Sequence, residues 1–183
     1  MGVLAIQGDF AKHLEALEAL GVSRREIRTP EELAGCTHVI IPGGESTTVG
    51  KLLQRFGMGD ALIERAKAGM PIWGTCMGMI MLAQRIEDSE QYSLGLLDVT
   101  VKRNAFGAQI HSFEALIPVA GLDEPVMGVF IRAPVVTESG PEVSELGSID
   151  GKVVVVRQRN ILGTSFHPEL TDDRRLHAWF CEF

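Results

Sequence analysis

The first half of the sequence alternates short apolar runs with segments of helical periodicity, and this alternation restricts the fold more than any other feature. The expected strands are residues 3–6, 38–41 and a run that begins at 71–73, and the expected helices are residues 10–20, 47–56, 60–68 and 77–85. Strands and helices in this order form a mostly parallel sheet with helices on both faces. The sequence therefore predicts an α/β fold.

The second half of the chain changes character. Turn residues separate further expected strands at residues 97–103, 115–118, 126–131, 153–157 and 161–166, and a closing helix is expected at residues 171–180. These strands predict an antiparallel extension of the parallel core. A length of 183 residues fits one domain, residues 1–183, with a substantial buried core.

Charge and cysteine content exclude several classes of protein. The formal net charge of −7 argues against nucleic acid or an anionic membrane as the main partner. No apolar run is long enough to span a bilayer, and the N-terminus lacks the pattern of a secretory signal. The three cysteines form no CxxC pair, which excludes a disulfide framework and a thiolate zinc site. We therefore expect a cytoplasmic protein.

Residues 73–79 place Gly-x-Cys-x-Gly between a strand and a helix. This is the cysteine counterpart of the nucleophile elbow, a sharp turn in which glycines avoid steric clashes and the apex side chain projects from the sheet. We interpret Cys76 as a nucleophile and the N–H of Met77 as a donor to an oxyanion. The alternative is that Cys76 is a small buried hydrophobe, as we expect for Cys36 and Cys181.

A second motif, His167-Pro168-Glu169, follows the expected strand at residues 161–166. Residues two apart on an extended chain point to the same side, so that Glu169 can orient the ring of His167. The pair predicts a proton carrier with its orienting carboxylate; the alternative is an exposed histidine beside a solvated glutamate. The other histidines are weaker candidates: His13 and His177 lie in expected helices, His38 starts a strand, and His111 has no carboxylate at i+2.

The third motif is the glycine loop at residues 42–48, which again follows a strand and precedes a helix. Its free N–H groups suit an anion, and beside the elbow Gly43 and Gly44 are candidates for a second oxyanion donor. Glu45 is a candidate for binding a substrate ammonium group. The alternative is a tight turn in which Ser46 or Thr47 caps the helix.

Taken together, these motifs resemble the class I glutamine amidotransferases, and more closely the glutaminase subunits of pyridoxal 5′-phosphate (vitamin B6) synthase. The segments that carry the resemblance are residues 4–8, 42–48, 74–76, 103–107, 128–134 and 165–170. They span nearly the whole chain. Two positions depart from the family: Met77 replaces a usual alanine, and Ala108 replaces a common arginine.

The resemblance implies a flavodoxin-like three-layer sandwich and ammonia delivery to a separate synthase subunit, a (β/α)₈ barrel. It also implies that glutamine is contacted by Gly43, Gly44, Glu45, Arg103, Ile131 and Arg132. Gln7 is implied to lie at the synthase interface and to help organise the oxyanion hole. From the residues alone, Arg103 and Arg132 are either surface charges or partners for a carboxylate.

The expected reaction is hydrolysis of L-glutamine through a γ-glutamyl thioester on Cys76, with His167 as the proton carrier. This chemistry needs no metal and no organic cofactor. Three alternatives remain: a glutaminase that serves another synthase, a partner-free cysteine hydrolase of γ-glutamyl substrates, and a non-catalytic module. Co-purification of a synthase or activity on γ-glutamyl peptides distinguishes them.

Overall fold

The structure, a computed structural model, describes residues 1–106 and 112–183. In chain order its elements are β1 (Gly2–Leu4), α1 (Phe10–Ala19), β2 (Arg25–Ile27), α2 (Pro30–Leu33), β3 (Val39–Ile41), α3 (Ser46–Arg55), α4 (Met58–Lys67), β4 (Ile72–Thr75), α5 (Met77–Leu82), β5 (Ala83–Ile86), β6 (Leu97–Lys102), β7 (Ser112–Ile117), β8 (Val126–Ile131), β9 (Val135–Ser139), β10 (Ser144–Ile149), β11 (Lys152–Gln158), β12 (Ile161–Thr164), the 3₁₀ helix η1 (Pro168–Leu170) and α6 (Arg175–Phe180). Ala108 and His111, which the sequence analysis discussed, lie outside the described residues.

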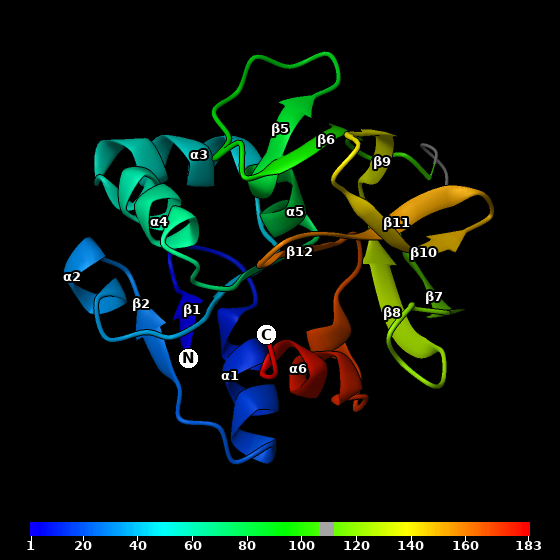
Figure 1. Ribbon diagram of the computed structural model, residues 1–183, viewed down its shortest axis with the longest axis horizontal. Helices are drawn as coiled ribbons and strands as arrows, with labels where there is room; N and C mark the ends of the chain where they lie inside the picture. Colours follow the sequence, from blue (N-terminus) through cyan, green and yellow to red (C-terminus); the bar gives the residue numbers. More distant parts are fainter. Residues whose placement is uncertain (107–111) are drawn as a thin grey trace.

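The main sheet joins a parallel half to a largely antiparallel half (Figure 1). Its strand order is β2-β1-β3-β4-β12-β11-β9-β6-β5, with β10 paired to β11. Pairing is parallel from β2 through β12, and β11 pairs antiparallel with both β12 and β9. Strands β7 and β8 form a separate antiparallel hairpin. The predicted parallel α/β core with an antiparallel extension is thus confirmed.

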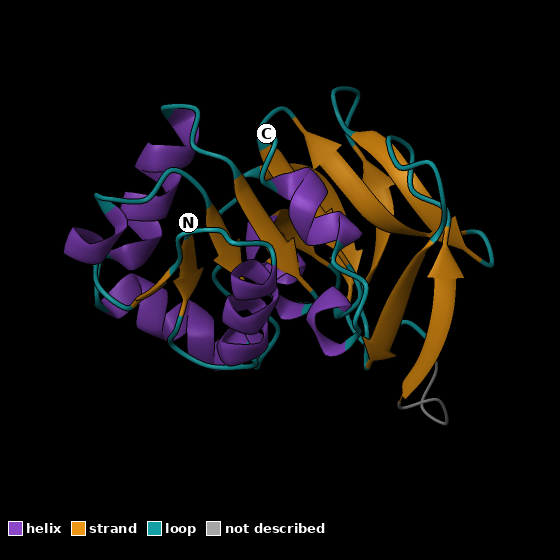
Figure 2. Cartoon of the chain, turned by 90° about the horizontal axis from the view of Figure 1, so that it is seen from below, coloured by secondary structure: helices purple, strands orange, loops and turns teal. Residues whose placement is uncertain are grey.

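Helices cover both faces of the parallel half. Figure 1 shows α1 and α6 together on one face and α3 and α4 on the other, and Figure 2 gives a second view of these layers. Because side chains alternate along a strand, neighbouring residues enter different cores. Ile40 packs in the core beneath α1 and α6, whereas Val39 and Ile41 pack in the core beneath α3 and α4. The apolar runs of the sequence are therefore buried on both faces, as parallel strands require.

The two glycines of the cysteine elbow allow α5 to pack closely against the sheet. A Cβ atom on Gly78 would lie 2.0 Å from the carbonyl oxygen of Ile41, and one on Gly74 would lie 2.3 Å from the carbonyl carbon of Gly78. Both contacts are with backbone atoms, which cannot move aside as a flexible side chain can. The Gly-x-Cys-x-Gly pattern is therefore a steric requirement of the turn between β4 and α5.

Two expected helices are shorter than predicted. The helix expected at residues 77–85 ends at Leu82, because Ala83–Ile86 pairs with β6 as strand β5. The helix expected at residues 171–180 begins only at Arg175. Before it, the side chain of Thr171 donates to the carbonyl of Pro168 and accepts from the N–H of Asp173. Such side-chain bonds compete with helix formation.

Within the described ranges, none of the helices has the length and apolar character needed to cross a membrane.

Candidate active site

Four neighbouring parallel strands deliver the candidate residues to one edge of the sheet. Gln7 follows β1, the glycine loop follows β3, Cys76 follows β4 and His167 follows β12. Because the carboxyl ends of parallel strands lie at the same edge, residues far apart in the sequence meet there. The topology therefore gathers the three sequence motifs into one place.

These strand ends line a cleft of about 470 Å³, a size within the range of small-molecule sites. The predicted site residues at this cleft are Gln7, Gly43, Gly44, Glu45, Cys76, Met77, Arg103, Ile131, Arg132 and His167. Of the predicted site residues only Glu169 is outside the lining, because it lies behind His167 and is only 2% exposed. The structure thus brings together every residue that the sequence singled out for the site.

Cys76 occupies the strained apex of the elbow. Its backbone φ of 50° is in the left-handed region, which residues with a side chain rarely adopt. The residue is 8% exposed, and its Sγ lies 3.9 Å from the carbonyl oxygen of Ile131 at the end of β8. Backbone strain of this kind is often stored at functional sites, where the surrounding structure holds it in place.

His167 is held in position from two sides. Its backbone N–H donates to the backbone carbonyl of Val129 at 2.8 Å, and this bond attaches the residue to β8. Its ring Nδ1 is 2.7 Å from Oε1 of Glu169. The ring also lies against Gly43, where a Cβ atom would be 2.3 Å from Cε1 of His167. Gly43 must therefore lack a side chain for the imidazole to occupy this position.

The electrostatics of the pair favour an imidazolium. Burial by itself lowers the pKa of His167, but hydrogen bonds with Cys76 and Glu169 outweigh burial and raise the pKa to about 10. Burial raises the pKa of Glu169, yet its histidine neighbours leave that pKa below the usual value. His167 is then charged at neutral pH and able to stabilise a thiolate on Cys76.

We expect the alkylation of Cys76 by iodoacetamide to report this charge. Because the raised pKa keeps His167 protonated below about pH 10, its charge should make alkylation at pH 7 several-fold faster in the wild type than in His167→Asn. The measurement is mass spectrometry of the Cys76 peptide in a Cys36→Ala, Cys181→Ala background. Equal rates at pH 7 in both proteins would contradict an imidazolium at His167.

The glycine loop is connected to the end of β1. The N–H of Glu45 donates to Oε1 of Gln7 at 3.2 Å. A Cβ atom on Gly8 would lie 1.6 Å from the carbonyl oxygen of Gly43, so that the two segments touch at their backbones. Residues 7–8 and the glycine loop are therefore in direct contact.

Glu45, and neither Ser46 nor Thr47, caps helix α3. Its carboxylate accepts from the N–H of Thr47 at 2.9 Å and from the N–H of Thr48 at 2.8 Å. Hydrogen bonds from Thr48 and Thr47 lower the pKa of Glu45 to about 2. The charge is therefore fixed at the cleft, where it can still attract an ammonium group.

Arg103 directly follows β6 and Arg132 directly follows β8, and both line the cleft. Nη1 of Arg103 donates to Oε1 of Gln91 at 3.1 Å. Arg132 has a left-handed backbone with φ of 45°. Two arginines and the acidic Glu45 line one cleft and provide charges of both signs, which suits a zwitterionic amino acid.

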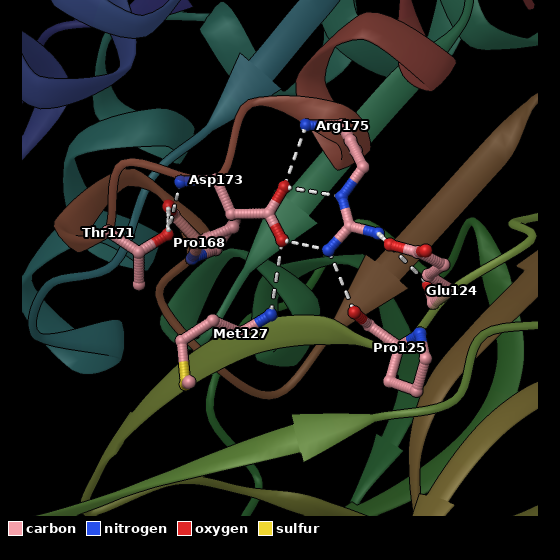
Figure 3. A network of polar contacts seen from close by, with 7 residues as sticks. All are labelled: Glu124, Pro125, Met127, Pro168, Thr171, Asp173 and Arg175. Carbon is pink, nitrogen blue, oxygen red and sulfur yellow. Dashed lines mark hydrogen bonds and ion pairs between the residues drawn. The ribbon is translucent and has the colours of Figure 1, made fainter.

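A polar network fixes the segment that follows Glu169 (Figure 3). The carboxylate of Asp173 accepts from the N–H of Met127 at 3.3 Å and from Nη2 of Arg175 at 2.7 Å. The same Nη2 donates to the carbonyl of Pro125 at 2.8 Å. The network thus joins the start of α6 to the start of β8, the strand that holds His167.

Sequence reasoning missed several residues at the site. The further lining residues are Gly8, Asp9, Ser46, Ile80 and Asn104. It also set His13 aside as a helical residue, yet His13 is fully buried, with its Nε2 3.4 Å from Oε2 of Glu169. One signal was present: His13 and Leu17 are four residues apart and so share a helix face, which predicts burial of both.

The comparisons with known proteins agree with this geometry. The model of the SNO glutamine amidotransferase family matches residues 3–183. A Desulforudis audaxviator protein called pyridoxal 5′-phosphate synthase subunit PdxT is 53% identical, with 100% of this chain and 97% of the relative covered. A Carboxydothermus hydrogenoformans protein of the same name is 51% identical, with 100% and 96% covered.

Two solved structures superpose on nearly the whole chain. A crystal structure described as a glutamine amidotransferase superposes with a TM-score of 0.95 at 49% identity, over 99% of this chain and 96% of the other. PurLQS of Thermotoga maritima superposes with a TM-score of 0.70 at 16% identity, over 99% and 96%. The second likeness concerns the fold alone.

Proposed function

The chain belongs to the SNO glutamine amidotransferase family and is a glutaminase, the subunit of a pyridoxal 5′-phosphate synthase that hydrolyses glutamine; we propose that Cys76, His167 and Glu169 carry out this hydrolysis. One observation supports the assignment of these residues above all others. A cysteine on a strained elbow shares a cleft with an imidazole whose Nδ1 is 2.7 Å from a buried carboxylate.

In the first step, the Cys76 thiolate attacks the side-chain amide carbon of glutamine. The carbonyl oxygen becomes an oxyanion, which the N–H groups of Met77 and of the Gly43–Gly44 loop stabilise. The C–N bond then breaks. Nε2 of His167 gives its proton to the departing nitrogen, which leaves as ammonia, and a γ-glutamyl thioester remains on Cys76.

In the second step, water hydrolyses the thioester. The neutral His167 accepts a proton from the attacking water, the C–S bond breaks, and glutamate leaves. The thiolate–imidazolium pair is thereby restored. Glu169 supports both steps, because its hydrogen bond fixes the ring orientation of His167 and its charge stabilises the imidazolium.

The substrate is held by charge at its amino-acid end. In this proposal Arg103 and Arg132 bind the α-carboxylate of glutamine and Glu45 attracts its α-ammonium. The backbone of Ile131 and the Gly43–Gly44 loop contact the side chain. Met77 contributes its N–H, and its longer side chain lies beside the loop, 3.2 Å from the place that a Cβ on Gly44 would take.

The partner in this proposal is a (β/α)₈-barrel synthase subunit that receives the ammonia directly. Ammonia released into water would be protonated, and an ammonium ion is not a nucleophile. Gln7 is the proposed contact with the synthase, because its side chain already bonds to Glu45 of the glycine loop. A partner that moves Gln7 would thereby adjust the oxyanion donors. Three free cysteines support a reducing compartment, the cytoplasm, as the place of assembly.

The test is glutamine hydrolysis by the purified chain, alone and with saturating barrel subunit. We expect the synthase to raise turnover roughly a hundredfold, the effect of one well-placed oxyanion donor. Gln7→Ala should reduce the stimulated rate and leave the basal rate nearly unchanged. Equal turnover with and without synthase would remove the activation while leaving the hydrolase assignment. An equal loss in both rates would make Gln7 a structural residue.

A further inference from the structure

A pair of histidines is buried behind the candidate active site. His13 on α1 and His177 on α6 both have an exposed fraction of 0%. The two helices lie on the same face of the sheet (Figure 1), and Nδ1 of His13 is 3.0 Å from Nε2 of His177. The mechanism proposed above uses neither residue, although buried ionisable groups are costly to retain.

The contacts of His13 continue to Glu169. Its Nε2 lies 3.2 Å from Oγ1 of Thr75 and 3.4 Å from Oε2 of Glu169. Among the described residues, Oε2 of Glu169 has no hydrogen-bond partner, whereas Oε1 is bound to His167. Nε2 of His13 thus approaches the second oxygen of this buried carboxylate within ion-pair distance, while its hydrogen bond is with Oγ1 of Thr75.

Both histidines are neutral. Burial lowers the pKa of His177 to about 3. Burial is also the main reason that the pKa of His13 is lowered, although the charge of Glu169 opposes the shift. A neutral imidazole has one donor and one acceptor nitrogen, so that the position of a single proton fixes the direction of each hydrogen bond.

The surroundings select one of the two directions. If Nδ1 of His13 were the donor, its bare Nε2 could accept from Oγ1 of Thr75, but the same lone pair would face the carboxylate, and His177 would carry its proton on Nδ1. Within the described ranges, Nδ1 of His177 is buried and has no partner. An unpaired buried N–H is rarer than an unpaired acceptor. The favourable direction is therefore from His177 Nε2–H to His13 Nδ1, and from His13 Nε2–H toward Oγ1 of Thr75 and the neighbouring Oε2 of Glu169.

We propose that His13 is a positioning residue for glutamine hydrolysis, whose Nε2–H restrains Oε2 of Glu169 while His167 binds Oε1. His177 fixes the tautomer of His13 that this contact needs. The inference rests on the proposed roles of His167 and Glu169, and extends their hydrogen-bonded pair to a chain of four side chains. With both oxygens restrained, the carboxylate stays ionised and keeps the His167 ring aimed at Cys76.

The titratable and charged groups around this carboxylate and the two buried histidines come from three segments. They are His167 beside it, Asp9 and His13 at the start of α1, and Asp173, Arg174 and His177 at and before α6. Among residues 1–106 and 112–183, only His13 and His167 approach the carboxylate oxygens themselves. Loss of the His13 donor should therefore make Glu169 easier to protonate.

The experiment compares His13→Phe with His13→Gln in the complex with saturating synthase. Phenylalanine fills the space without a donor, so that kcat should fall roughly ten- to hundredfold, the effect of losing one close polar contact with a charged group. KM should change less than twofold, and the acid limb of the kcat/KM profile should move to higher pH. Glutamine places an amide N–H near the former Nε2 and should restore most of kcat and the wild-type profile.

Leu17→Ala is the matched control for instability. Leu17 is fully buried, lies one turn further along α1 and has an apolar side chain that can neither donate nor accept a hydrogen bond. It should lower the melting temperature at least as much as His13→Phe does, without moving the pH profile. An unchanged kcat and profile in His13→Phe, or an equal pH shift in Leu17→Ala, would overturn the proposal.

A readout without catalysis separates this inference from the proposed function. In wild-type protein, ¹⁵N chemical shifts should show a neutral His13 with its proton on Nε2. In His177→Phe the Nε2 proton should no longer be fixed, and both tautomers should appear. A wild-type His13 protonated on Nδ1 would overturn the inference even if glutamine hydrolysis proceeds through Cys76.

Discussion

Cys76→Ala should abolish glutamine hydrolysis, with a loss in kcat of at least about 10⁴-fold, because no other group can form the thioester. The fold should survive, since the elbow depends on the glycines at 74 and 78 and not on the sulfur. The measurement is glutamate release with saturating synthase, alongside the melting temperature. Full activity in this variant would overturn the mechanism.

The other two cysteines provide the controls. Cys36 is 3% exposed, and its Sγ lies 3.6 Å from the carbonyl oxygen of Glu32, far from the cleft lining. Cys181 directly follows α6 and is partly buried. Cys36→Ala and Cys181→Ala should retain most of the activity. Each should cost some stability, because a buried sulfur is removed.

His167→Asn and Glu169→Gln should separate the proton carrier from the residue that orients it. Asparagine cannot transfer the proton, so that kcat should fall by about 10³-fold or more. Glutamine keeps the shape of Glu169 but removes its charge and can favour the wrong tautomer, for which we expect a loss of roughly 10²-fold. Steady-state kinetics of both variants with saturating synthase give the comparison.

The relative order of these two losses is the test. If Glu169→Gln were silent while His167→Asn was inactive, the carboxylate would have no part in the reaction and the triad would reduce to a pair. In that case the 2.7 Å contact between Nδ1 and Oε1 would serve packing alone. An equal and complete loss in both would show that the orientation of the ring is as important as its proton.

Much of the site could be predicted from the sequence because its motifs are local. The elbow around Cys76 and the His-x-Glu pair each need only a strand, a turn and the residues at the turn, and these occur within a few positions of one another. The glycine loop is equally local. Hydrophobic periodicity then predicted the strands that carry them, and the order of strands and helices predicted that their carboxyl ends meet.

Local patterns failed where a long-range contact overrides the chain's own preference. The helix expected at residues 77–85 overlaps Ala83–Ile86, which pairing with β6 makes a strand. The partner strand is visible only once the two segments are placed in space. The cap of α3 is a different case: Ser46 or Thr47 was expected to cap the helix, yet the carboxylate of Glu45 accepts from the N–H groups of Thr47 and Thr48.

The sequence by itself determined the α/β class, the family and the chemistry at the strand ends, because each depends on residues that are neighbours along the chain. Only the tertiary structure decided what lies behind His167. His13 and His177 are 164 residues apart, in helices that share a face of the sheet. Their contact and the approach of His13 to Glu169 come from the packing of α1 and α6, which no spacing of residues encodes.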